Sequence, residues 1–309
     1  MKEKAKRIIL FSLPYIYMVS VFLFRVHQIR SNKAFLKTEQ FEFIAWLFTV
    51  AFIVAVQYLY SRNKRLTEQK TRDEAVMETA RQIQTGLVPH ILNENADGIL
   101  VSAYMLAAKE VGGDFYDFFR VDGDHLAFVI ADVSGKGVPA ALFMMRAKTL
   151  IKSLTQPGEG TASILKRVND ELCEGNEAGL FVTVWLGILE ISSGRMTVTN
   201  AGHEHPVVRR KDGAYELMVY KHSIMLGVFE DETFEEHEFM LKQGDSLFVY
   251  TDGVVEADNA SEEMFGTDRL TEALNKNPEA APEEAVALVK ETVDAFSGDA
   301  EQFQTFADC

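Results

Sequence analysis

The sequence predicts an α+β fold, in which antiparallel strands form sheets and helices pack outside them. From residue 98 onward, short apolar runs alternate with turn signals, and consecutive runs are joined by tight turns at residues 192–194 and 211–213. Tight turns connect antiparallel neighbours, whereas parallel strands need a long crossover connection. The sequence therefore favours a layered sandwich over a doubly wound parallel sheet.

The individual elements follow from local patterns along this region. Helix-forming stretches predict helices at residues 139–155, 161–174 and 282–296. Pro139 suits a first helical turn and Thr161 suits an N-cap. Apolar runs predict strands at residues 99–106, 126–131, 180–191, 195–201, 206–210, 215–220, 237–241 and 246–251.

Charge divides the chain into two unlike parts. The formal net charge of −15 is the sum of +9 over residues 1–72, with 13 Lys/Arg against four Asp/Glu, and −24 over the remaining residues. The acidic total argues against nucleic acid as a main partner. Only two cysteines, Cys173 and Cys309, are present, which excludes a disulfide framework and a cysteine-rich zinc site.

The basic N-terminal part contains two uncharged apolar stretches, at residues 8–24 and 43–60. Each is close to the ~20 residues that cross a bilayer, so we expect residues 1–60 to form a two-span hairpin in the cell (inner) membrane. Nine Lys/Arg flank the outer ends of the spans and four lie between them. This distribution predicts that both termini and the acidic residues 73–309 lie in the cytoplasm. A signal peptide, or two buried core helices, are the alternatives.

Residues 61–89 predict a helical linker that ends at Pro89. Leu66, Val76, Ala80 and Ile83 fall on one seven-residue register with Leu87, while polar residues interrupt the seam. A half-polar seam predicts a weak two-stranded coil, and hence a homodimer through residues 61–88. A connector helix that docks on its own domain is equally compatible with the pattern.

Three aspartates have settings that suggest chemistry. Asp132 and Asp252 each end a buried apolar run, and Asp114 follows two glycines. A carboxylate at the exit of a buried strand is costly unless it is exposed, paired or bound to a cation. Oxygen ligands without a His/Cys cluster select Mg²⁺ or Mn²⁺. Taken alone, Asp252-Gly253 is also compatible with a plain turn.

Other catalytic motifs are absent. The sequence contains no GxGxxG or Walker spacing, and Ser134 has no evident partnering base. His203 is compatible with lining a site or with capping a turn.

Six motifs occur in a fixed order: RQIQTGLVP at 81–89, EVGGDFYD at 110–117, ADVSGKGVPAA at 131–141, NAGH at 200–203, YTDGVVE at 250–256 and MFG at 264–266. Together they resemble the SpoIIE/RsbU-type branch of the PPM metal-dependent protein serine/threonine phosphatases. The resemblance covers roughly residues 75–303 and does not include the hairpin.

The resemblance implies an α/β/β/α sandwich over residues 90–309, in which two antiparallel sheets are flanked by helices and hold two Mn²⁺ or Mg²⁺ ions. It implies a water, activated by the ions, that hydrolyses phosphoserine or phosphothreonine on a regulatory protein such as an anti-anti-sigma factor. The residues that it assigns are Asp132 as bridging and catalytic ligand, Asp114, Asp252 and the Val133 carbonyl as further metal ligands, Lys136 as a phosphate or leaving-group contact, and Asp117 and His203 as supporting residues.

The sequence departs from the family pattern after Phe303. Where the pattern continues with Asp-Asp-x-Thr and a final apolar strand, residues 304–309 read QTFADC. We therefore expect the last metal-ligand aspartate and the closing strand to be missing, through a truncation or frameshift. The alternative function is a pseudophosphatase that binds the same partner without turnover.

Overall fold

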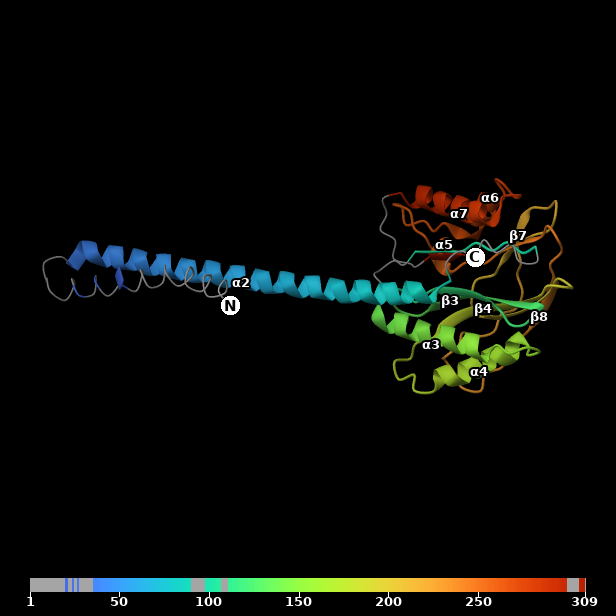
Figure 1. Cartoon of the computed structure of the whole chain (residues 1–309). Helices are drawn as coiled ribbons and strands as arrows, with labels where there is room; N and C mark the ends of the chain where they lie inside the picture. The colour runs from blue at the N-terminus through green and yellow to red at the C-terminus, as the bar shows by residue number, and fades with distance from the viewer. Residues whose placement is uncertain are drawn as a thin grey trace. The chain divides into compact units, whose positions relative to one another are not determined.

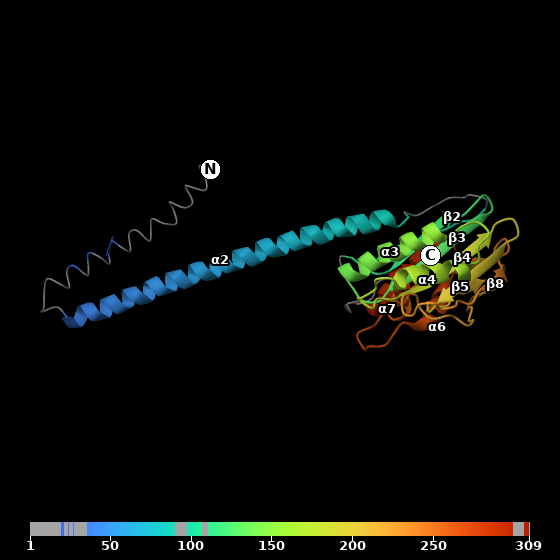
Figure 2. The same cartoon turned by 90° about the horizontal axis from the view of Figure 1, so that it is seen from below.

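The computed structural model describes residues 36–89, 98–106, 111–298 and 306–308, together with Ser20, Val21, Phe24 and His27. The chain divides into two compact units, Met1–Glu74 and Ala75–Cys309. Figures 1 and 2 show the second unit as helices on both sides of a stack of strands.

Helix α2 (Leu36–Leu87) contains both the second predicted span and most of the predicted linker in one 52-residue element. Its apolar side chains at Phe48, Phe52 and Tyr58 are exposed. Across the part of the chain that the structure describes, no helix combines the length and apolar character needed to cross a membrane. The first predicted span lies outside the described residues, except for Ser20, Val21 and Phe24.

A five-stranded antiparallel sheet forms the centre of the second unit. Its order is β2 (Phe115–Arg120), β3 (His125–Val133), β4 (Val182–Glu190), β5 (Arg195–Ala201) and β8 (His237–Met240). Side chains alternate along β3: Ala127 and Val129 join the core on one face, while Ile130 belongs to the core on the other. This period of two, with both faces buried, explains why β3 reads as a continuous apolar run.

Helices α3 (Val138–Leu154) and α4 (Thr161–Cys173) cover one face of this sheet (Figure 1). Met144 and Ile151 of α3 and Leu165 and Val168 of α4 are fully buried against the strands. Their spacing of three or seven residues places them on one face of each helix.

The second sheet has the order β7 (Tyr215–Leu217), β6 (Val207–Arg209) and β9 (Ser246–Phe248). It packs with α5 (Asp252–Val255), α6 (Gly266–Leu274) and α7 (Pro282–Ser297) around Phe265, Leu270 and Val289. Trp185 and Val249 belong to a further core shared by the two sheets. The predicted α+β sandwich of antiparallel sheets with outer helices is thereby confirmed.

Two short strands form a separate two-stranded sheet. β1 (Tyr104–Leu106) pairs antiparallel with β10 (Phe306–Asp308). Residues 306–308 thus form a short paired strand, while the predicted loss of the family's closing strand and last aspartate stays a prediction. A three-residue strand requires only backbone donors and acceptors, which the altered sequence at 306–308 retains.

Candidate metal centre

Strand register brings Asp114 and Asp132 together. Phe115 pairs with Ala131 across β2 and β3, so that the next residues outward, Asp114 and Asp132, face each other at the end of the ladder. Their carboxyl groups are within hydrogen-bonding reach of each other. Two residues predicted separately from sequence thus form one carboxyl pair.

Asp252 is the third carboxylate of this site and lies four residues after β9 of the second sheet. It is the first residue of α5, directly after the buried Thr251, whose hydroxyl hydrogen-bonds to Asp114. The backbone nitrogen of Glu256 donates to the Asp252 carbonyl at 2.7 Å, which closes the short α5 turn. Strands from both sheets therefore converge on Asp114.

The electrostatics of the site favour a bound cation. Burial, reinforced by the charge of Asp132, raises the pKa of Asp114 well above its usual range. Burial also raises the pKa of Asp132, and burial with the charge of Asp132 raises the pKa of Asp252 to about 7. Each raised pKa means that negative charge is unfavourable here unless a positive group compensates it.

Two further acidic residues, Glu204 and Glu256, contribute to this field. Both carboxylates raise the pKa of Asp252 through their charge. Sequence reasoning did not single them out as site residues. Glu256 lies four residues after Asp252, one helical turn away, and this spacing was an available signal.

The residues present fit a hard divalent cation. The Oδ2 atom of Asp114 is buried without a hydrogen-bond partner, which is costly for a carboxylate unless a ligand satisfies it. Within the described ranges, no three His, Cys, Asp or Glu side chains lie close enough together to surround one ion. Mg²⁺ commonly uses only one or two carboxylates and completes its shell with water and phosphate oxygens, so this arrangement suits it.

Val133 directly follows Asp132, and Lys136 lies four residues after it. The Val133 carbonyl lies against Gly113, where an added Cβ would come within 2.6 Å of it. This oxygen therefore lies close to the backbone that directly precedes Asp114. Lys136 is exposed, and its charge acts to lower the pKa of Asp132. This placement near the carboxyl pair is compatible with a phosphate contact, and that role stays a prediction.

Asp117 lies on the other face of β2 from Asp114. It is buried in an ion pair with Lys148 of α3, and Lys152 approaches the same oxygen at 3.5 Å. Asp117 thus anchors α3 on the sheet, and its predicted role in supporting the metal ligands stays a prediction.

His203 is buried beside the carboxyl pair. Its Nδ1 lies 2.8 Å from the Thr183 hydroxyl, which approaches the Asp132 carbonyl at 3.5 Å. Burial lowers the pKa of His203 to about 3, so the ring is neutral at physiological pH. Its place next to β3 and β4 suits a supporting residue rather than a proton donor.

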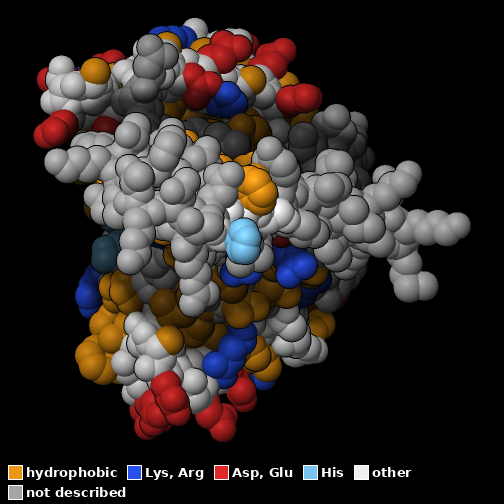
Figure 3. Space-filling view, turned by 90° about the vertical axis from the view of Figure 1, so that its left-hand side faces the viewer, with side chains coloured by type: hydrophobic (Ala, Val, Ile, Leu, Met, Phe, Trp, Pro, Cys, Tyr) orange, Lys and Arg blue, Asp and Glu red, His pale blue; other side chains and the backbone are white. Residues whose placement is uncertain are grey.

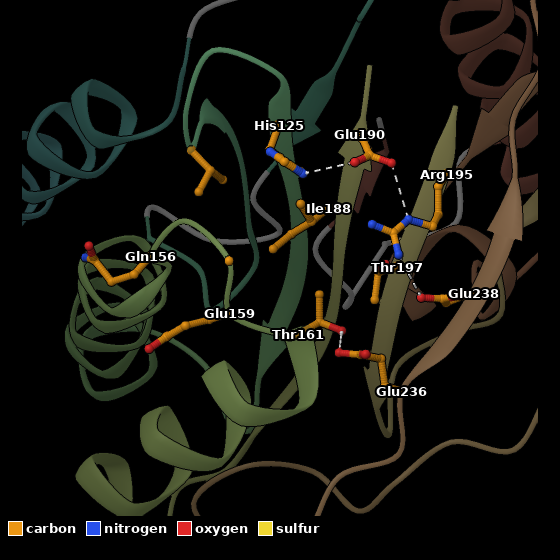
Figure 4. A pocket seen from close by; sticks show the side chains of 13 residues that line it. His125, Gln156, Glu159, Thr161, Ile188, Glu190, Arg195, Thr197, Glu236 and Glu238 are labelled. Atoms are coloured by element: carbon orange, nitrogen blue, oxygen red, sulfur yellow. Dashed lines mark hydrogen bonds and ion pairs between the residues drawn. The ribbon is translucent and has the colours of Figure 1, made fainter. Parts of the chain in front are cut away.

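A pocket of about 210 Å³ lies at the opposite ends of the strands (Figure 4). His125 and Glu190 form the last pair of the β3–β4 ladder, seven residues from the Asp132–Thr183 pair. Within the pocket, Arg195 pairs with Glu190 at 3.4 Å and with Glu238 at 3.5 Å. The pocket is therefore separate from the three aspartates.

The surface of the protein is not uniformly negative, although residues 73–309 carry a formal net charge of −24. In Figure 3, Asp and Glu side chains gather at two opposite margins of one face, and hydrophobic side chains lie between them with Lys and Arg. Two apolar side chains of α3, Val138 and Leu142, are 38% and 61% exposed. The electrostatic potential therefore differs between parts of this surface.

Known proteins share both the sequence and the fold. The family model described as Stage II sporulation protein E (SpoIIE) matches residues 122–303. Protein IcfG of Synechocystis sp. is 29% identical over 283 residues, covering 80% of this chain and 44% of that protein. Phosphoserine phosphatase RsbU of Bacillus subtilis is 27% identical over 210 residues, covering 68% of this chain and 62% of that protein. The chain therefore matches less than two thirds of the length of either relative.

A solved structure gives the same result for the fold. The SiaA-PP2C domain of Pseudomonas aeruginosa superposes with a TM-score of 0.68 at 19% identity, covering 77% of this chain and 96% of that one. At this identity the similarity shows the fold alone.

Proposed function

The chain belongs to the SpoIIE family, and from this membership we propose that it is a metal-dependent protein serine/threonine phosphatase of the PP2C (PPM) type. The observation that carries the proposal is the buried Asp114–Asp132 pair, in which the Asp114 Oδ2 lacks a hydrogen-bond partner. Asp252 lies beside the pair and supplies a third carboxylate. These are the oxygen donors that Mg²⁺ and Mn²⁺ prefer.

The residues of the site have separate tasks in this proposal. Asp132 would bridge two Mn²⁺ or Mg²⁺ ions, and Asp114, Asp252 and the Val133 carbonyl would complete the protein ligands. When bound, such ions supply a nucleophilic water near neutral pH and neutralise charge on the phosphoryl group. Lys136, exposed at the end of β3, would contact the phosphate or assist the leaving group. No covalent nucleophile is required.

The substrate class is phosphoserine or phosphothreonine on a regulatory protein, such as an anti-anti-sigma factor. The name of RsbU, a phosphoserine phosphatase, supports phosphoserine. The three aspartates lie at or just beyond strand ends, next to loops, which is where binding and catalytic residues commonly lie.

Membrane anchoring is part of the proposal. Residues 1–72 carry +9, and their two uncharged stretches are flanked mainly on the outer sides by Lys and Arg. Basic flanks of this kind retain both ends in the cytoplasm. The exposed apolar side chains of Phe48, Phe52 and Tyr58 on α2 also support contact with an apolar phase. Two spans in the cell (inner) membrane would then leave the phosphatase unit in the cytoplasm.

A homodimer through residues 61–88 accounts for a second set of exposed apolar residues. Leu66, Val76, Ile83 and Leu87 are 53%, 65%, 55% and 41% exposed on α2. These side chains follow the seven-residue register, so a second copy of the helix would cover them. Signals that alter this pairing, or the spans, would then reach the phosphatase unit through α2.

A second candidate function is binding of the phosphorylated partner without turnover. Residues 304–307 read QTFA where the family pattern has Asp-Asp-x-Thr, and this substitution removes an expected metal-ligand aspartate. Loss of one ligand lowers metal affinity but leaves the rest of the site in place.

Hydrolysis of a phosphoserine protein in Mn²⁺ distinguishes the two functions. The full chain is compared with Asp132→Asn and with Gln304→Asp/Thr305→Asp/Ala307→Thr, which restores Asp-Asp-x-Thr. The enzyme proposal predicts activity in the wild type that Asp132→Asn reduces at least about 100-fold. Activity confined to the restored variant would establish the binding function instead.

A further inference from the structure

Helix α2 reaches the loop that carries Asp114. We propose that Gln84, near the end of α2, is a positioning residue that holds the Gly112–Gly113 turn so that Asp114 meets Asp132. The inference rests on the proposed function, because it concerns the metal affinity of that site.

The side-chain amide of Gln84 hydrogen-bonds to both backbone polar groups of Gly112. Its Nε2 donates to the Gly112 carbonyl at 2.6 Å, and its Oε1 accepts from the Gly112 nitrogen at 3.2 Å. Gln84 is only 5% exposed, and Gly112 is buried as well. The side chain thus replaces a neighbouring strand for this glycine, whose two polar groups would otherwise need other partners.

A second contact fixes the chain on the other side of Asp114. The Tyr116 hydroxyl donates to the Pro89 carbonyl at 2.9 Å, and Val88 packs in one buried cluster with Tyr116. Residues 112 and 116 lie two positions before and two positions after Asp114. The end of α2 and the two residues that follow it therefore hold both sides of the segment that carries Asp114.

The turn has little room to shift between these contacts. An added Cβ at Gly113 would lie 2.6 Å from the Val133 carbonyl, so the backbones of residues 113 and 133 are already in close contact. Release of Gly112 would let this contact open, and Asp114 would move relative to Asp132. Residues that orient metal ligands in this way commonly change metal affinity by 10–100-fold when replaced.

Gln82 is a matched control on the same helix. It lies two residues earlier, is exposed, and bonds Glu78 at 3.1 Å without contact to the site. Met has similar length and helix propensity to Gln and lacks its donor and acceptor. Gln84→Met therefore removes both hydrogen bonds to Gly112, and Gln82→Met reports the general cost of the replacement.

Two measurements on the full chain test the role. The first is the Mn²⁺ concentration for half-maximal hydrolysis of a phosphoserine protein, with kcat at saturating Mn²⁺. We expect Gln84→Met to raise that concentration about 10-fold or more while kcat stays within about threefold, and Gln82→Met to match the wild type. The second is amide hydrogen exchange over residues 111–116 without metal, which we expect to accelerate about 10-fold in Gln84→Met alone.

Half-saturation and exchange that stay within about twofold of the wild type in a folded Gln84→Met variant would overturn the proposal. If Gln84→Met does not fold, Gln84→Glu keeps the length and the acceptor but lacks the donor to the Gly112 carbonyl. It should also raise the Mn²⁺ concentration for half-maximal hydrolysis. A wild type without phosphatase activity would contradict the proposed function, while the exchange measurement would still decide the role of Gln84.

Discussion

Asp252 combines burial with the charges of three neighbouring carboxylates. These effects raise its pKa to about 7, against an ordinary value of 3.8. A carboxyl group whose pKa is raised by folding supports stability fully below its unfolded pKa, and this support is lost as pH rises through the folded pKa. The metal-free protein should therefore lose stability between about pH 4 and pH 7.

Replacement of Asp252 by asparagine should remove this dependence. We expect Asp252→Asn to raise the melting temperature of the metal-free protein by a few degrees at pH 8, and by much less at pH 5. Thermal melts in chelator at the two pH values measure the difference. A gain at pH 5 equal to or larger than that at pH 8 would contradict the assigned cause.

Gly113 tests how closely the two ligand segments must approach. We expect Gly113→Ala to weaken Mn²⁺ binding at least about 10-fold, because its Cβ would lie 2.6 Å from the Val133 carbonyl. Gly123→Ala is the control, since an added Cβ there meets no atom within 4 Å. Equal Mn²⁺ affinity in both variants, measured by calorimetry, would show that the close approach does not matter.

The sequence singled out the three aspartates, because a carboxylate after a buried strand needs a partner, and in the structure the three carboxyl groups interact. Their role as metal ligands stays a prediction. The sequence did not single out Glu204 or Gln84. Glu204 raises the pKa of Asp252, and Gln84 hydrogen-bonds to Gly112. Both interactions join segments that are distant in the chain. No local spacing encodes such contacts.

Among the elements, strand β2 was not predicted although its neighbours were. Its sequence, FYDFFR, places Asp117 in the strand interior, where charged residues are unfavourable. In the structure Lys148 of α3 pairs with Asp117 and makes this burial possible. Tertiary pairing thus overrides the local preference, and the ion pair is visible only once α3 is placed on the sheet.

Gly187 in β4 makes room for the Trp185 ring. An added Cβ would lie 2.5 Å from that ring and 3.3 Å from the Met196 sulfur. We expect Gly187→Ala to lower the free energy of unfolding by about 1–3 kcal/mol in urea titrations. In a Trp185→Phe background, which lacks the outer ring atoms, the cost should fall below about 1 kcal/mol. The same cost in both backgrounds would exclude the ring clash as its cause.

For the whole molecule, the division of charge and the exposed seam of α2 motivate the proposal of a membrane-anchored homodimer. The seam residues Leu66, Val76, Ile83 and Leu87 stay exposed in one chain. We expect the full chain in detergent to be dimeric by light scattering. Leu66→Asn/Val76→Asn should shift it to monomer, because polar residues on the seam weaken pairing. A monodisperse wild-type monomer would exclude the dimer.

The α+β sandwich was predictable because alternating apolar runs and tight turns leave few other arrangements. The pairing of β10 with β1 was not, because three residues carry too little pattern to predict a strand. The structure also shows where part of the negative charge of residues 73–309 lies. Several of its carboxylates are gathered around Asp252, where they favour a cation.

The proposed metal centre is best tested by calorimetric titration of the metal-free full chain with Mn²⁺, with Asp132→Asn as the comparison. We expect saturable binding in the wild type that Asp132→Asn weakens at least about 10-fold, since Asp132 interacts with both Asp114 and Asp252. No saturable binding in the wild type, or equal affinity in both proteins, would contradict a metal centre at Asp114, Asp132 and Asp252.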